Sequence, residues 1–423
     1  MDPLRSPQTA PDCPVLSHIK KIANELQPQL LNIRRHLHAH PELSGKEYKT
    51  TAYVANILST AGISAQETVG QTGLIAHLQS NPQSKIQAES QNEIQGDRPL
   101  PLLAIRTDMD ALPIQERTRL SFDSVFSGIM HACGHDIHTT VGLGTAMVLK
   151  QLSRHHPCNA RFIFQPAEET AKGAQWMVDA NAMANVDHIL SLHVFPTIPG
   201  GSIGIRYGAL TAAADDLEIV IEGESGHGAR PHEAIDAIWI AAQVITTLQQ
   251  AISRSQNPLR PVVLTIGQIQ GGRAPNIIAD RVCLVGTVRS IHPETTQTLP
   301  QWITQLVTQV CQTHGARCQV NYAPCVPSVQ NDRPLTQLLE HSARRALGDR
   351  HIQILPDPSM GGEDFAYYLH HAPGTMFRLG VGWRDRPNYP LHHPQFNPDE
   401  QSILTGIITL AYTAYNYWHC PSQ

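Results

Sequence analysis

The sequence predicts an α/β protein in which a layered α/β domain is interrupted by a smaller α+β domain. Short apolar runs alternate with helical patterns in the first half of the chain and again after about residue 324, which is typical of a sheet layered with helices. Between residues 216 and 320 the predicted order is strand, helix, strand, strand, helix, strand, the split βαβ order of ferredoxin-like units. We therefore expect a discontinuous domain of residues 15–212 and 325–423, an inserted domain of residues 213–324, and a flexible tail of residues 1–14.

The first domain opens with helical patterns. A helix is predicted over 16–38, interrupted or kinked near Pro28. Ser44 and Glu47 have the spacing of a capping box, which predicts a second helix that ends at Gly62. Strands and helices then alternate, with a long polar loop over 79–101. The predicted strands cover 74–78, 102–105, 161–164 and 189–192, and the predicted helices cover 138–153 and 172–180.

The inserted domain has its own hydrophobic pattern. Leu217, Ile219 and Ile221 alternate with polar residues, which predicts a strand. A helix with one apolar face follows over 234–253, and strands are predicted over 262–269 and 282–288. A second helix that stops at Gly315 and a last strand over 317–321 complete the unit.

Composition excludes several classes of protein. The chain has 423 residues, a net charge of −5 and 41% hydrophobic residues, with no apolar run long enough to span a membrane. It shows neither a secretory signal nor a basic run of the kind that binds nucleic acid. The 8 cysteines include no CxxC pair. We therefore expect a cytoplasmic protein with mostly reduced thiols.

Candidate metal ligands gather in residues 131–138, His-Ala-Cys-Gly-His-Asp-Ile-His, directly before a helical pattern. Thiolate, imidazole and carboxylate groups at this density can bind a divalent metal. A polar loop with an incidental thiol is the alternative for this segment.

Two further groups follow predicted strands. Glu168 and Glu169 come after the strand over 161–164, and in an extended segment they would point in opposite directions. One could then bind a metal while the other acts as a general base, although an acidic turn that opens a helix is also possible. His193 follows the strand over 189–192, where a backbone partner alone could satisfy it.

The common location of these residues strengthens the metal hypothesis. Asp108 and Asp110, the glutamate pair and His193 all follow the carboxyl ends of predicted strands, where ligands bind in open α/β sheets. The histidine pair at 392–393 could join them from far along the chain. A thiolate, a carboxylate and several imidazoles make a plausible set for two metal ions.

Together these motifs resemble the M20 metallopeptidase family, specifically its amidohydrolase branch of N-acyl-amino-acid, hippurate and auxin-conjugate hydrolases. The resemblance extends over about residues 33–400. It is carried by IRRHLHAHPELSGKE, RTDMDALP, MHACGHDIHTT, QPAEE, LHV, SGHGARPHEAIDA, APNIIAD, GTVR, GGEDFAYY and LHHPQF.

The resemblance implies roles for individual residues. Glu168 would be the general base, and Asp110 would orient a metal-bound group. Asp108 stands where other branches have a ligand histidine, and His393 is the alternative to its neighbour as a ligand. The implied metal ligands are Cys133, His135, Glu169, His193 and His392. The cofactors would be two divalent ions, manganese or zinc, with cobalt or nickel as further options.

The resemblance also implies a zinc-peptidase-like catalytic domain with a mixed sheet and an inserted lid that makes the contacts of a homodimer or larger homo-oligomer. His227 of the lid would stabilise an oxyanion, although a turn residue between glycines is the alternative. Asn276 and Arg289 would bind the carboxylate of the substrate, whereas a structural salt bridge is the alternative for Arg289.

The implied function is the metal-dependent hydrolysis of small N-acyl-L-amino acids to a carboxylic acid and a free amino acid. A dipeptidase or carboxypeptidase of the same family is the alternative. A serine hydrolase is disfavoured because no GxSxG motif occurs, and a zinc deaminase because no PCxxC element occurs. A non-catalytic binding protein would have no need for the second glutamate of the 168–169 pair.

Overall fold

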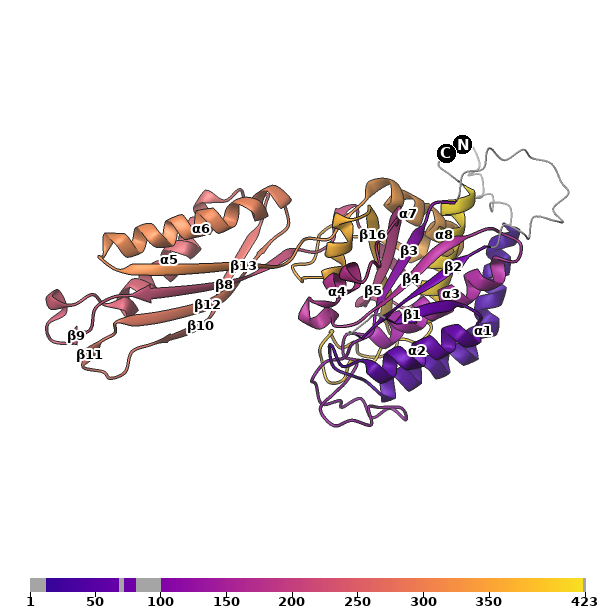
Figure 1. The fold of residues 1–423 in the computed structure, drawn as a ribbon, viewed down its shortest axis with the longest axis horizontal. Helices are drawn as coiled ribbons and strands as arrows, with labels where there is room; N and C mark the ends of the chain where they lie inside the picture. The colour runs from indigo at the N-terminus through magenta and orange to yellow at the C-terminus, as the bar shows by residue number, and fades with distance from the viewer. Residues whose placement is uncertain (1–12, 68–71, 81–99, 421–423) are drawn as a thin grey trace, which may run out of the picture. The chain divides into compact units, whose positions relative to one another are not determined.

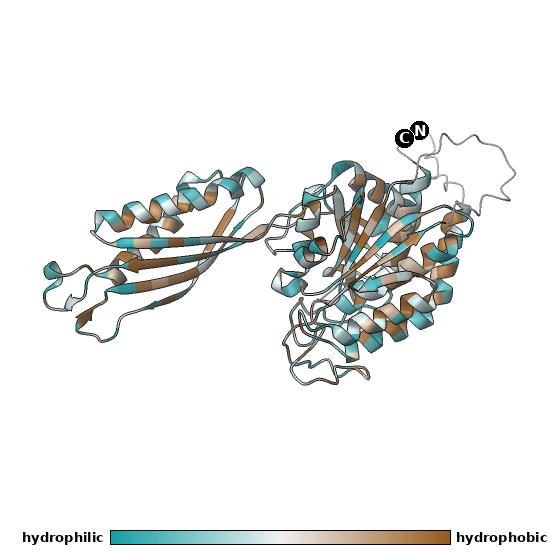
Figure 2. Cartoon of the chain, in the orientation of Figure 1, coloured by the Kyte–Doolittle hydropathy of each residue, from teal (hydrophilic) through white to brown (hydrophobic). Residues whose placement is uncertain are grey.

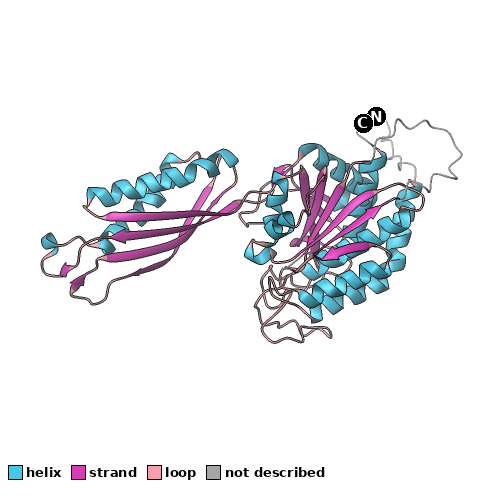
Figure 3. Cartoon of the chain, viewed as in Figure 1, coloured by secondary structure: helices cyan, strands magenta, loops and turns pink. Residues whose placement is uncertain are grey.

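The computed structural model describes residues 13–67, 72–80 and 100–420 (Figure 1). Contacts divide the chain into two compact units. The first comprises described residues within 1–206, 331–355 and 368–423, and the second comprises 207–330 and 356–367. Each unit has its own sheet and its own helices (Figure 3). Most of the predicted tail over 1–14 and of the predicted loop over 79–101 lies outside the described residues.

The first unit is built on an eight-stranded mixed sheet, which confirms the predicted α/β class. Strands β3, β4, β5 and β16 run parallel to one another. On one side β2 and β1 follow in antiparallel pairs, and on the other side β6 is antiparallel to β16 and parallel to β15. In spatial order the strands are β1 (Ser64–Glu67), β2 (Leu74–Gln79), β4 (Asn159–Gln165), β3 (Leu103–Asp108), β5 (His188–Pro199), β16 (Gly374–Gly382), β6 (Ile203–Ile205) and β15 (Ile352–Ile354).

Helices cover this sheet and one another. Helix α3 (His135–Leu152) is buried along almost its whole length and contacts α1 (Pro14–Ala39), α8 (Ser402–His419) and strand β3. A Cβ atom on Gly144 would lie 2.3 Å from Cδ1 of Ile407, so a larger residue here would displace the Ile407 side chain of α8. The remaining helices are α2 (Tyr48–Thr60), which contacts β1, α4 (Gly173–Asp179), which contacts β4, and α7 (Arg333–Leu347), which packs on α8.

Three details differ from the sequence prediction. Helix α1 continues through Pro28 without interruption. Helix α2 has no side-chain cap, because Ser44 instead donates a hydrogen bond to Asp110. Helix α3 begins at His135 rather than at 138, after Gly134 with φ +81. A Cβ on Gly134 would lie 2.5 Å from Cγ2 of Val194, so this glycine lets the start of α3 approach β5.

The second unit has a four-stranded antiparallel sheet with the order β10-β12-β8-β13. Its elements are β8 (Ala213–Glu222), α5 (Ala237–Ser255), β10 (Val262–Gly271), β12 (Arg281–Ser290), α6 (Pro293–Thr313) and β13 (Arg317–Val326). This is the split βαβ order. Apolar residues of α5 and α6 pack on one face of the sheet, and hydrophobic and hydrophilic residues alternate around these helices (Figure 2).

Short elements complete the structure. Strand β9 (Gly226–His227) pairs with β11 (Ile277–Ile278), and β7 (Gly208–Ala209) with β14 (Gln330–Asn331). Single 3-10 turns are η2 (Glu168–Thr170), η3 (Pro231–Glu233) and η4 (Asp349–His351), and η5 (Asp364–His370) is a longer 3-10 helix of 7 residues. No helix in the described part of the chain is long and apolar enough to cross a membrane.

Candidate metal centre

Potential metal ligands meet at one edge of the first unit's sheet. Strand β3 ends at Asp108, β4 leads into Glu168 and Glu169, and β5 carries His193 just beyond the end of its pairing with β3. The N-terminus of α3 adds His135 at the same edge. The sequence predicted this convergence because parallel strands present their carboxyl ends together.

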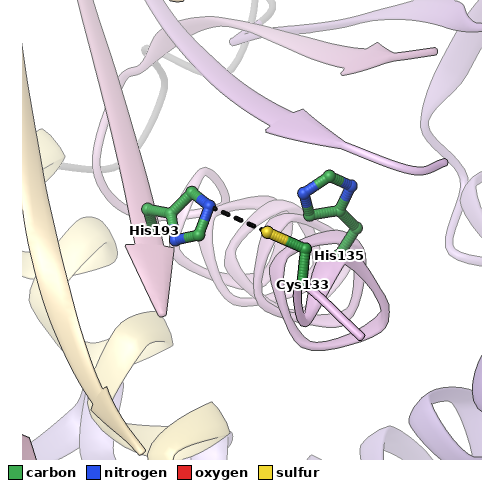
Figure 4. A group of neighbouring side chains, drawn as sticks. All are labelled: Cys133, His135 and His193. Atoms are coloured by element: carbon green, nitrogen blue, oxygen red, sulfur yellow. Dashed lines mark hydrogen bonds between the residues drawn. The ribbon is translucent and has the colours of Figure 1, made fainter. Parts of the chain in front are cut away.

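The first donor group consists of Cys133, His135 and His193, whose ligand atoms lie within 4.8 Å of one another (Figure 4). The Sγ atom of Cys133 is 3.5 Å from Nε2 of His193. Nδ1 of His193 lies 2.8 Å from the carbonyl oxygen of Val194 and donates a hydrogen bond to it. This bond fixes the tautomer that directs the lone pair of Nε2 towards the cysteine.

His135 is oriented in a similar way by Asp110. Its Nδ1 lies 2.9 Å from the carbonyl oxygen and 3.1 Å from Oδ1 of Asp110. Its Nε2 is buried and has no hydrogen-bond partner in the part of the chain that the structure describes, and it lies 3.9 Å from a carboxylate oxygen of both Glu168 and Glu169. An aspartate that holds the far nitrogen of a histidine is the usual companion of a metal-binding imidazole.

The second donor group consists of Cys133, Glu169 and His392. Nε2 of His392 lies 3.5 Å from Oε1 of Glu169. The neighbouring His393 stacks on Tyr389 instead, and its Nδ1 accepts the N–H of Gln395. The structure therefore brings His392, and not His393, to the cluster. Cys133 is common to both donor groups.

The glutamate pair differs from the expected extended geometry. Glu168 and Glu169 lie in the 3-10 turn η2, which follows Ala167 at φ +52. Both carboxylates approach the same His135 nitrogen, so the prediction that they point in opposite directions is wrong. The tight winding of a 3-10 turn places successive side chains about 120° apart, whereas an extended strand separates them by 180°.

Asp108 belongs to a supporting network. Its Oδ1 accepts a hydrogen bond of 2.5 Å from Nδ1 of His138, and its Oδ2 accepts one of 2.7 Å from Arg106. Nε2 of His138 in turn accepts the N–H of Val194 at 2.8 Å. Because both ring nitrogens of His138 are engaged, this histidine supports the cluster and is not oriented as a ligand. Burial would raise the pKa of Asp108, but His135, His138 and Arg106 together lower it well below its usual range.

The chemistry of the donor groups fits a divalent metal. Burial, followed by the charge of Glu169, raises the pKa of the Cys133 thiol well above its usual value, so a thiolate here needs a nearby cation. Burial also lowers the pKa of His193, which keeps its imidazole neutral and able to bind metal. Nε2 of His135 and Oε1 of Glu169 are buried, and among the described residues neither atom has a partner with hydrogen-bond geometry. Sulfur and nitrogen donors of this kind suit zinc and related ions.

The other predicted site residues lie in the second unit. His227 on β9 and Asn276 beside β11 are exposed neighbours, since Gly228 donates its N–H to the carbonyl oxygen of Asn276. Arg289 lies near the end of β12 and donates a hydrogen bond to the carbonyl oxygen of Met360. The roles predicted for these three residues stay predictions.

Sequence reasoning missed several residues that support the cluster. Arg106 is fully buried in β3, and a lone arginine in an apolar strand next to Asp108 is a signal that could have revealed it. Ser44 and Glu47 were assigned to a helix cap, although both lie within the long motif at 33–47. Their true partners are distant in sequence, so no local pattern could have identified them.

The cysteine, histidine and glutamate cluster at the edge of this mixed sheet has the composition of a site for divalent metal. Residues 104–416 match the model of peptidase family M20/M25/M40. The chain belongs to this family, which confirms the resemblance seen in the sequence.

Named relatives cover nearly the whole chain. A Synechocystis protein called "Probable hydrolase sll0100" is 62% identical over 401 residues, which are 95% of this chain and 98% of that protein. The N-acetyl-L-cysteine deacetylase of Bacillus subtilis is 38% identical over 92% of this chain and 87% of its own length. The crystal structure of the Bacillus subtilis YXEP protein, described as a dinuclear metal-binding peptidase of the M20 family, has a TM-score of 0.79 and 34% identity, and covers 93% of this chain and 99% of that chain. These similarities, with the donor groups, support divalent metal binding.

Proposed function

We propose that the chain is a metal-dependent amidohydrolase that cleaves N-acyl-L-amino acids to a carboxylic acid and a free amino acid. The observation that carries the proposal is the pair of donor groups that share Cys133 beside a further carboxylate, Glu168. The similarity to an N-acetyl-L-cysteine deacetylase supports the type of substrate.

The two donor groups would each hold one divalent ion, manganese or zinc. Cys133 would contribute to both, with His135 and His193 completing one site and Glu169 and His392 the other. When bound, the ions would lower the pKa of a water molecule towards neutrality and polarise the amide carbonyl. Asp110 would keep His135 in its ligand orientation through the hydrogen bonds to Nδ1.

Glu168 would be the general base. It would take a proton from the attacking water and pass this proton to the leaving nitrogen as the amide bond breaks. Its Oε2 lies 3.9 Å from Nε2 of His135, so its carboxylate is beside the donor groups, and its side chain is only 11% exposed. A general base of this kind contributes roughly 10²–10⁴-fold to the rate.

The second unit would act as a lid and make a homodimer. Arg289 would bind the substrate carboxylate, and His227 would stabilise the developing oxyanion. Within one chain these two residues are far apart, because Arg289 pairs with Ala214 at one end of the sheet and β9 follows the other end of β8. The length of β8 from Ala214, the partner of Arg289, to Glu222 is roughly 26 Å at about 3.3 Å per residue. His227 and its neighbour Asn276 would therefore reach the site of a second copy.

Glu168→Gln tests the proposal. In the protein loaded with manganese or zinc, hydrolysis of N-acetyl-amino acids should fall roughly 10²–10⁴-fold while the bound metal, measured by elemental analysis, stays at the parental level. Glu25→Gln, an exposed glutamate on α1, is the matched control and should retain parental activity. Undiminished hydrolysis by Glu168→Gln would exclude this residue as the base.

A substrate comparison separates the proposed function from its alternative. The parent protein should turn over N-acetyl- or N-benzoyl-amino acids faster than unblocked dipeptides, because the proposed reaction needs an acylated amino group. A clear preference for dipeptides would make the chain a dipeptidase or carboxypeptidase of the same family.

A further inference from the structure

Glu47 is a buried carboxylate held by neutral hydrogen-bond donors. It has 0% exposure, and within the part of the chain that the structure describes it forms no ion pair. Its Oε1 accepts the N–H groups of Gly45 at 2.8 Å and Ala167 at 2.9 Å, and its Oε2 accepts the hydroxyl of Thr72 at 2.5 Å. Burying a carboxylate costs several kcal/mol unless hydrogen bonds compensate, so these three bonds are the reason that it is tolerated.

One of these bonds holds the turn that carries the glutamate pair. Ala167 is fully buried, has φ +52 and directly precedes Glu168. The left-handed region costs a residue with a Cβ about 1–2 kcal/mol, so the turn needs an external partner to keep this conformation. A hydrogen bond from the Ala167 N–H to an ionised carboxylate is of the strong, charge-assisted kind.

The segment that contains Glu47 also holds the turn at a second point, through Ser44 and Asp110. The N–H of Glu169 donates to Oδ2 of Asp110 at 3.0 Å, and this oxygen also accepts the hydroxyl of Ser44 at 2.6 Å. Residues 44–47, which we call the 44–47 clamp, therefore contact the turn through Glu47 directly and through Ser44 by way of Asp110.

Packing leaves the turn little room to move. A Cβ on Gly73 would lie 2.7 Å from Cδ of Pro166, and a Cβ on Gly173 would lie 1.6 Å from the carbonyl oxygen of Pro166. Gly73 and Gly173 thus pack against Pro166, the residue before the turn. The hydrogen bonds of the 44–47 clamp then fix the position of the turn at the edge of the sheet.

We infer that Glu47 is a positioning residue that sets the locations of the Glu168 and Glu169 carboxylates. Its consequence for catalysis rests on the proposed function, in which one carboxylate is the base and the other a metal ligand. A displacement of about 1 Å at a reacting group can cost on the order of 10²-fold in rate. Loss of Glu47 should therefore change kcat and metal binding together, although Glu47 contacts neither substrate nor metal.

Three variants separate positioning from general stability. Glu47→Gln keeps an oxygen for the two N–H groups and can donate to the Thr72 hydroxyl, whereas Glu47→Ala removes every bond. Thr336→Ala is the control, because Thr336 is fully buried and bonded to Thr375 at 2.9 Å in α7 and β16, away from the turn. At a temperature well below all melting points, Glu47→Ala should lose at least about 30-fold in kcat on an N-acetyl-amino acid with KM changed less than about threefold. Glu47→Gln and Thr336→Ala should stay within about threefold of the parent in kcat, since neither moves the turn.

Cobalt binding gives a readout that does not depend on catalysis. Titration of the metal-free proteins with Co²⁺, followed by absorption, should show about 10–100-fold weaker binding for Glu47→Ala and parental binding for the other two variants. If the parent hydrolyses no N-acyl-amino acid, the proposed function fails, and the cobalt titration alone then decides the role of Glu47. The inference is overturned if Glu47→Ala binds cobalt like the parent, or if Thr336→Ala loses as much cobalt affinity as Glu47→Ala.

Discussion

Replacement of Arg34 by methionine should destabilise the first unit strongly. Arg34 is fully buried in α1, and its guanidinium lies 3.0 Å from Asp136 and 3.1 Å from Glu400. Asp136 is itself fully buried at the start of α3, so the variant leaves a carboxylate inside the protein with the imidazole of His38, 2.8 Å away, as its other partner. Breaking a buried ion pair from one side typically costs about 3–5 kcal/mol.

Arg35→Met is a matched control, because the neighbouring arginine contacts the same Glu400 at 2.7 Å but has a 45% exposed side chain. An exposed pair contributes about 0–1 kcal/mol. Urea dependence of amide hydrogen exchange in α3 peptides measures the local free energy of unfolding in each variant. The double variant Arg34→Met with Asp136→Leu should lose less than the sum of its single changes. Equal losses for Arg34→Met and Arg35→Met would refute the reasoning.

Four further expectations concern pH, packing, capping and metal. Burial would raise the pKa of Glu400, but Arg35 and Arg34 lower it below its usual value of 4.5. The ionised carboxylate therefore stabilises the fold above about pH 4.5, and this stabilisation is lost as the pH falls through the lowered pKa of the folded protein. The urea concentration at the midpoint of unfolding should therefore fall less between neutral and acid pH for Glu400→Gln than for the parent protein. Gly144→Val should cost about 1–3 kcal/mol by overpacking against α8, measured as a lower melting temperature. Asp332→Ala removes the side-chain cap of α7 and should cost about 0.5–2 kcal/mol, seen as faster amide exchange in its first turn. A chelator should lower the melting temperature of the first unit, and zinc or manganese should restore it. At a free metal concentration 1,000 times the dissociation constant, binding should add about 4 kcal/mol to the free energy of unfolding.

The order of helices and strands could be predicted because hydrophobic periodicity is a local property of the chain. The alternation of Leu217, Ile219 and Ile221, for example, depends only on which face of one strand is buried. The convergence of Asp108 and His193 followed from the same information, since parallel strands end at a common edge.

The geometry inside the site depended on contacts that no local pattern records. Ser44 and Glu47 have the spacing of a capping box, yet their hydrogen bonds go to Asp110 and Ala167. Which donor satisfies a buried carboxylate is decided by the segments that fold against it, and these lie far away in sequence. The 3-10 turn at Glu168 has the same origin, because the left-handed Ala167 before it is held by tertiary hydrogen bonds.

The discontinuity of the first unit has a consequence for synthesis on the ribosome. Strand β16 lies between β5 and β6 in the sheet, although it follows them by well over a hundred residues in the chain. The sheet therefore stays divided until residues 374–382 have left the ribosome, whereas the four-stranded sheet and the two long helices of the inserted unit are complete at Val326. Since domains fold as units when their residues emerge, the inserted unit is able to fold first. Strands β5 and β6 are still unpaired on the sides that β16 later occupies. During this interval the nascent chain exposes unpaired strand edges, which are templates for pairing with other chains and therefore for aggregation.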